Sequence, residues 1–73
     1  MHDSVEQRRL EKFGASLKEM RIDSGYSTLR SFAAEIRISL KTLHHIEAGS
    51  NWPSMPVYLR ICTKLKLPDP PLF

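Results

Sequence analysis

The chain contains a single cysteine and no long apolar run, and each of these absences excludes a class of protein. Cys62 is the only cysteine among the 73 residues, so no intrachain disulfide can form and nothing in the chain needs an oxidising compartment. No apolar run approaches the length of a membrane helix or of a secretory signal, and Met1 is followed at once by His2 and Asp3. We therefore expect a protein of the reduced cytoplasm that does not bind a membrane.

The length of the chain limits the chemistry that it can support. A chain of 73 residues has room for one domain with one small core, but not for a deep substrate pocket beside that core. We therefore expect no enzyme activity and no cofactor. A hydrophobic content of 41% is ordinary for a folded protein. The prediction is one domain over residues 1–73, with a core at about 13–67 and a proline-rich tail at 68–73.

Acidic residues are scarce in the second half of the chain. Residues 1–35 carry six basic and six acidic side chains, whereas residues 36–66 carry five basic side chains and one acidic one, Glu47. A locally positive face suits a polyanion and would make binding weaken as salt is added. The alternative is that these charges only keep the protein soluble.

The stretch from Thr28 to Gly49 has the spacing of two short helices joined by a turn. Apolar residues three and four apart predict the buried stripe of the first helix: Leu29, Phe32, Ala33 and Ile36. Ser39 is the expected N-cap of the second helix, and Ile38 can pack on Leu43 four residues into it. Gly49 is the expected stop, since glycine adopts a positive φ easily. This is the plan of a helix-turn-helix, whose second helix can enter a DNA major groove.

A longer helix is predicted before this stretch and an amphipathic helix after it. The first has Asp3 or Ser4 as its cap, runs to about residues 22–24 and ends at Gly25. Its expected core face is Leu10, Phe13, Leu17 and Met20. The last helix begins at Ser54 and is closed by Leu67 and the proline after it. Its expected buried side is Met55, Tyr58, Leu59, Cys62 and Leu65.

These segments together resemble the lambda-repressor-like helix-turn-helix domains, also called the Xre or Cro/C1-type family. The resemblance covers about residues 13–67 and rests on LKEMR (17–21), FAAEIRIS (32–39), LKTLHHIEAG (40–49) and PSMPVYLRICTKLKL (53–67). It implies an all-α, compact domain of four or five helices that contains a helix-turn-helix. The reading helix would lie within LKTLHHIEAG (40–49), with Leu43 and Ile46 turned toward the core.

The resemblance implies two sets of DNA contacts. Base contacts would come from Leu40, Lys41, His44 and His45. Lys41 can donate to guanine or to a phosphate, the histidines can donate or accept, and Leu40 can contact a thymine methyl. Phosphate contacts would come from Thr28, Leu29, Arg30, Thr42, Ser50 and Asn51, with Leu29 and Arg30 donating backbone amides at a helix N-terminus. The alternative is that this face is polar only because it is exposed.

Arg21 and Glu47 match a pair that the family uses as a structural salt bridge from the first helix to the end of the reading helix. If they are two unrelated surface charges, they would contribute little to stability. The chain also departs from its relatives. Leu29 stands where many have a glutamine, and Arg37 stands at a turn position that is usually glycine, where a left-handed conformation is expected. The connection at residues 25–28 is about one residue longer than usual.

The sequence predicts no metal site. Adjacent residues such as His44 and His45 point about 100° apart on a helix, so they cannot both take the i, i+4 spacing of a helical zinc site. Cys62 is expected to be a buried, inert thiol. Trp52 could cover the edge of the core, stack on the sugar-phosphate backbone or join a dimer contact.

The predicted function is sequence-specific binding of double-stranded DNA by a transcription regulator in the cytoplasm of a bacterial or phage-infected cell, at its nucleoid. A homodimer on an inverted repeat is expected, because one reading helix covers few base pairs. Repression by occlusion of a promoter is the expected mode, and activation is the alternative. The dimer interface would use Leu67, Leu72 and Phe73. Two alternatives stay open: an antitoxin whose partner is a toxin, and a protein-interaction module without DNA contact, which Leu29 and Leu40 at contact positions favour.

Overall fold

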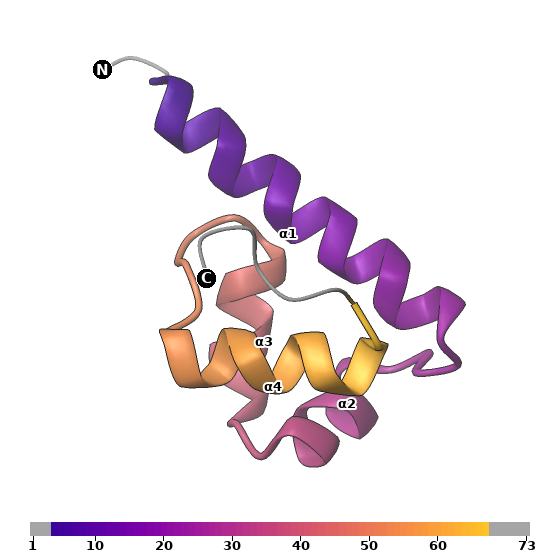
Figure 1. The fold of residues 1–73 in the computed structure, drawn as a ribbon. Helices are drawn as coiled ribbons and strands as arrows, with labels where there is room; N and C mark the ends of the chain where they lie inside the picture. The colour runs from indigo at the N-terminus through magenta and orange to yellow at the C-terminus, as the bar shows by residue number, and fades with distance from the viewer. Residues whose placement is uncertain (1–3, 68–73) are drawn as a thin grey trace.

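The computed structural model describes residues 4–67, which form four α-helices and no strand. Their bounds are Val5–Asp23 for α1, Leu29–Ile36 for α2, Leu40–Glu47 for α3 and Met55–Leu65 for α4 (Figure 1). The prediction of an all-α fold that contains a helix-turn-helix is confirmed. α2, the turn and α3 make up the helix-turn-helix.

Each helix begins at a hydroxyl side chain that caps it. The oxygens of Ser4, Thr28, Ser39 and Ser54 accept hydrogen bonds from the backbone amides three residues further on. Such a cap satisfies one of the amides that a helix leaves without an intrahelical acceptor at its start. Short polar residues in the sequence therefore fix all four starts, and the structure selects Ser4 as the cap of α1.

The helices end in two different ways. The chain turns at Gly25 after α1 and at Gly49 after α3, with φ values of 97° and 79°. α2 and α4 instead end on the cationic residues Arg37 and Lys66, whose φ values of 61° and 59° lie in the left-handed region. The expected end of α4 at Leu67 is therefore slightly wrong: the last helical residue is Leu65, Lys66 is the C-cap, and the amide of Leu67 donates back to the carbonyl of residue 62 at 2.9 Å.

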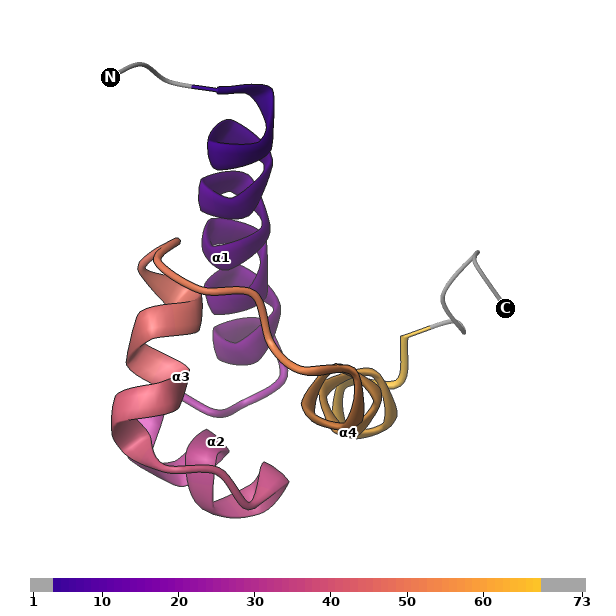
Figure 2. The ribbon, with the colours of Figure 1, turned by 90° about the vertical axis from the view of Figure 1, so that its left-hand side faces the viewer.

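The core is formed where the four helices meet. Its fully buried members come from every helix: Leu17, Phe32, Ala33, Ile36, Leu43, Ile46 and Ile61. α1 packs on α3, and α2 packs on both α3 and α4. Figure 2 shows α4 along its axis, with α3 on one side, α1 above and α2 below. None of the helices within residues 4–67 has the length and apolar character that crossing a membrane requires.

The face that α4 turns inward differs from the prediction. Met55 and Leu59 were expected to be buried but are 45% and 43% exposed, whereas Ile61 and Cys62 are buried and Val57 packs against the core. The reason is that α4 carries apolar side chains around most of its circumference. Its spacing fits two overlapping stripes, and only packing against α2 selects between them.

Gly14 lies at the closest approach of α1 and α3. A Cβ atom on this residue would lie 2.6 Å from the carbonyl oxygens of both Ile46 and Glu47, which is well inside van der Waals contact. The sequence analysis did not single out Gly14. A glycine inside an otherwise regular helix is itself a signal of close packing, because it weakens the helix relative to alanine.

Trp52 partly covers the edge of the core. Its ring centroid lies 5.4 Å from that of Phe13 with the planes tilted by 44°, and its side chain is half exposed. The ring centroid of Tyr58 lies 6.1 Å from that of Phe13. Of the three roles considered for Trp52, packing is the one seen here.

Candidate nucleic-acid interface

α3 separates its apolar and polar side chains onto opposite faces. Leu43 and Ile46 are completely buried. Lys41 and His44 are exposed and His45 is half-buried, while Leu40 at the first position is 37% exposed. The side chains proposed to contact bases therefore lie outside the core, on the surface that Leu43 and Ile46 hold in place.

Two hollows flank the exposed face of α3. On one side Lys41 and His45 border a hollow together with Asn51 and Trp52 of the loop before α4. On the other side His44 borders a hollow with Lys18 and Leu29. The two histidines thus point to different sides, with their ring planes at 76°, as expected for neighbours on a helix. α3 lies between the start of α2 and the loop at residues 50–54.

The start of α2 combines a side-chain cap with apolar packing. The hydroxyl oxygen of Thr28 accepts from the amide of Ser31 at 3.1 Å and also donates to the Ser31 hydroxyl. Leu29 packs against the core, whereas the Arg30 side chain is exposed. The amides of Leu29 and Arg30 occupy the first turn, where backbone N–H groups have no intrahelical acceptor and the helix dipole is positive.

The residues on the other flank use their backbone atoms within the protein. The amides of Ser50 and Asn51 both donate to the carbonyl of His45, at 2.9 and 3.4 Å, so a contact with DNA would come from their exposed side chains. Thr42 donates its amide to the Ser39 hydroxyl at 3.0 Å, and its own hydroxyl accepts from Ser39 at 2.8 Å.

Arg21 and Glu47 are buried together between α1 and the end of α3. Arg21 Nε lies 2.8 Å from Glu47 Oε2, and Nη2 donates to Oε1 at 3.3 Å. The third donor, Nη1, bonds the carbonyl of Tyr26 in the loop that leads to α2. Among the described residues, every buried side-chain nitrogen and oxygen has a hydrogen-bond partner. One guanidinium thus joins α1, the loop before α2 and the end of α3.

Some of the predicted site residues do not belong to the surface around α3. Leu67 is half-buried at the end of the described residues, and the other two members of the proposed dimer interface, Leu72 and Phe73, lie outside them. Lys18 of α1, which was not among the predicted site residues, borders the same hollow as His44. Within residues 4–67, no three His, Cys, Asp or Glu side chains gather into a possible metal site.

Comparison with known proteins identifies the domain type. A family model described as a helix-turn-helix domain matches residues 12–72, a range that includes α2, α3, α4 and most of α1. The searches of curated proteins and of solved structures found no match. The matched family model points to DNA binding and to transcription regulation, and it is consistent with the resemblance to the Cro/C1-type domains. The chain therefore belongs to the helix-turn-helix domain family.

Proposed function

We propose that the chain binds double-stranded DNA in a sequence-specific way and regulates transcription. The observation that carries this proposal is the exposed face of α3. Lys41 and His44 point outward from a helix whose Leu43 and Ile46 are completely buried. An outward basic and polar face on a firmly anchored helix is what reading of base edges in a major groove requires.

The residues around α3 take two roles in this proposal. Lys41, His44 and His45 contact base edges, and Leu40 contacts a thymine methyl group. Phosphates on one flank are bound by the Leu29 and Arg30 amides at the start of α2, with further contacts by Thr28, Thr42, Ser50 and Asn51. The phosphate contacts fix the orientation of the protein, and the base contacts select the sequence.

The proposed active form is a homodimer that binds an inverted repeat and represses transcription. α3 has eight residues and reaches only a few base pairs. A second subunit related by a two-fold axis, with half-sites about one helical turn apart, supplies the remaining affinity and specificity. The proposed dimer surface contains Leu67, Leu72 and Phe73. A dimer bound across a promoter would exclude the polymerase.

Selection of bound fragments from random duplex DNA tests this proposal. The expected product is a short sequence with two-fold symmetry, and its affinity should fall steeply between low and moderate salt because phosphate contacts release counterions. Recovery of no preferred sequence, together with equal and weak binding at both salt concentrations, would contradict it.

A protein-interaction module without DNA contact is the second candidate. The observation that favours it is Leu40, an exposed apolar side chain at the first position of α3. Leu29 adds no support, since its side chain packs against the core. Such a module would bind unrelated duplexes at neither low nor moderate salt, so the same titration separates the two candidates.

A further inference from the structure

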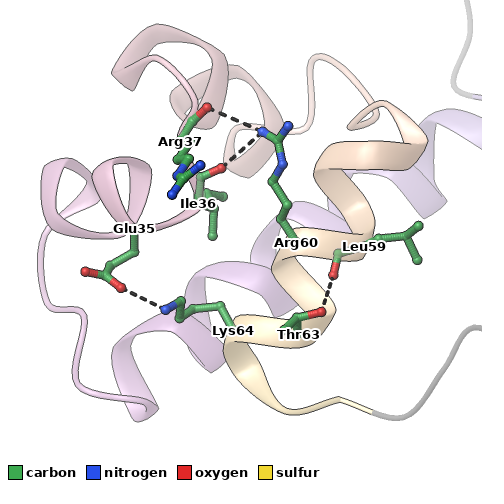
Figure 3. A pocket seen from close by; sticks show the side chains of 7 residues that line it. All are labelled: Glu35, Ile36, Arg37, Leu59, Arg60, Thr63 and Lys64. Atoms are coloured by element: carbon green, nitrogen blue, oxygen red, sulfur yellow. Dashed lines mark hydrogen bonds and ion pairs between the residues drawn. The ribbon is translucent and has the colours of Figure 1, made fainter.

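We propose that Arg60 on α4 is a positioning residue for DNA recognition, because it holds the turn between α2 and α3 in an unfavourable backbone conformation. The inference rests on the proposed function. Arg60 Nη1 donates to the carbonyl oxygens of Ile36 and Arg37 at 3.3 and 3.4 Å (Figure 3). These carbonyls belong to the last residue of α2 and to the first residue of the turn.

The end of α2 needs these donors. The amides of Arg37 and Ile38 already close the turn onto the carbonyls of Ala34 and Ala33, at 3.3 and 3.0 Å, but they do not reach the carbonyls that follow. The end of a helix carries partial negative charge, and α2 has no basic residue in its own last turn. Arg60, supplied by α4, brings a positive charge to this end.

The backbone conformation of Arg37 makes the turn depend more strongly on the donors of Arg60. The φ and ψ of Arg37, 61° and 47°, are left-handed, a conformation that is less favourable for a residue with a Cβ atom than for glycine. The Arg37 carbonyl is one of the two groups that Arg60 holds, and residue 39 is already the cap of α3. The direction of this carbonyl therefore influences the direction in which α3 begins.

Lys64 lies one turn beyond Arg60 and serves the same end of α2. Its Nζ is 2.8 Å from Glu35 Oε1, so it offsets an acidic residue at the negative end of the α2 dipole. Figure 3 shows both cations of α4 directed at α2 across the hollow between the two helices. Both are engaged by groups of the chain itself, which makes this hollow a structural contact between helices.

The test compares Arg60→Ala in two backgrounds. The affinity for the selected duplex should fall about fivefold in the natural background, a modest effect because both hydrogen bonds are long and partly exposed. With Arg37→Gly already present, glycine holds the left-handed turn without help, and the loss should shrink to less than about twofold. Lys66→Gly is the matched control, since it relieves the same conformation at the end of α4 and should leave the loss at about fivefold.

Further measurements distinguish a positioning role of Arg60 from a direct contact with DNA and from a loss of folding. The slope of log affinity against log salt concentration should be unchanged in Arg60→Ala, whereas loss of one phosphate contact reduces its magnitude by about one. Binding to a scrambled duplex of the same composition should change less than about twofold. Arg60→Lys, which keeps the charge but not the fork of donors, should show an intermediate loss at an unchanged melting temperature.

The inference is overturned if Arg60→Ala costs the same affinity with Arg37 and with Gly at position 37, or if the salt slope falls. Hydrogen exchange of the Ile38 amide measures the stability of the turn without DNA. It should become faster in Arg60→Ala and return to normal when Arg37→Gly is added. If the wild-type protein binds neither duplex, the proposed function fails, but this exchange experiment still decides whether Arg60 holds the turn.

Discussion

The C-terminal ends of α2 and α3 are held by ion pairs of equal length and very different surroundings. At the end of α3, Arg21 and Glu47 approach to 2.8 Å with side chains only 4% and 6% exposed. At the end of α2, Lys64 and Glu35 approach to the same 2.8 Å with side chains 36% and 47% exposed. Water and salt screen the second pair, whereas the first cannot be opened without leaving a charge buried. Folding therefore depends on the first pair far more than on the second.

Glu47→Ala is expected to have the largest effect on stability. It leaves the Arg21 guanidinium buried without its carboxylate partner, which should cost about 3–5 kcal/mol of the free energy of unfolding. Native domains of this size have only roughly 4–10 kcal/mol to lose, so the variant should lose a large share of its stability. Urea denaturation followed by circular dichroism measures the loss.

The matched double variant sharpens this prediction. Replacing both partners by apolar residues, as in Arg21→Met with Glu47→Leu, removes the buried charge together with its partner and should recover most of the lost stability. If Glu47→Ala alone costs less than about 1 kcal/mol, the buried pair behaves like an exposed one, and the contrast between the two ends disappears.

Gly14→Ala tests the same end of α3 through packing alone. A Cβ atom at this position would press on the backbone carbonyls of Ile46 and Glu47 at 2.6 Å. We expect a loss of about 2 kcal/mol, although alanine is the better helix former. Ser16→Ala on the exposed side of α1 is the control and should raise stability slightly through helix propensity. A Gly14→Ala variant as stable as Ser16→Ala would contradict the close approach of α1 and α3.

Lys41→Ala tests the exposed surface of α3 between these two ion pairs. A substitution there should affect DNA binding without affecting stability. Loss of a base or phosphate contact should weaken binding to the selected duplex about tenfold. The melting temperature should not change, because Lys41 is exposed. Lys12→Ala on the exposed side of α1 is a charge-matched control and should change affinity less than about twofold. A fall in melting temperature with Lys41→Ala would mean that this side chain supports the fold and is not part of a reading surface.

The local features of this fold could be predicted from the sequence, because short-range rules decide them. The caps at Ser4, Thr28, Ser39 and Ser54 need only a hydroxyl ahead of an apolar stripe. The left-handed conformation of Arg37 was expected from the family resemblance, because the matching turn position is usually glycine. The buried stripe of α3 follows from the spacing of Leu43 and Ile46.

Features that depend on distant residues could not be predicted in the same way. Arg60 donates to carbonyls 24 and 23 positions earlier in the chain, and no local pattern marks that contact. Which face of α4 is buried depends on α2, so that Leu59 was assigned to the core when Ile61 belongs there. The choice of DNA contacts depends on the shape and sequence of the bound duplex as well as on the protein surface, so no pattern within the chain decides it.

Glu35→Gln should have the smallest effect on stability, because it removes the more exposed of the two ion pairs. Glu35 raises the pKa of Lys64, first through their hydrogen bond and then through its charge. A raised lysine pKa stabilises the folded chain at pH values below the ordinary 10.5, and this contribution is lost as the pH rises through the raised pKa. Because both groups are exposed, thermal melts of the wild type and of Glu35→Gln should coincide at neutral pH and in strong alkali. A clear advantage of the wild type at neutral pH that disappears in molar salt would mean that this ion pair contributes more stability than its exposure predicts, and the C-terminal ends of α2 and α3 would then be held by interactions of similar strength.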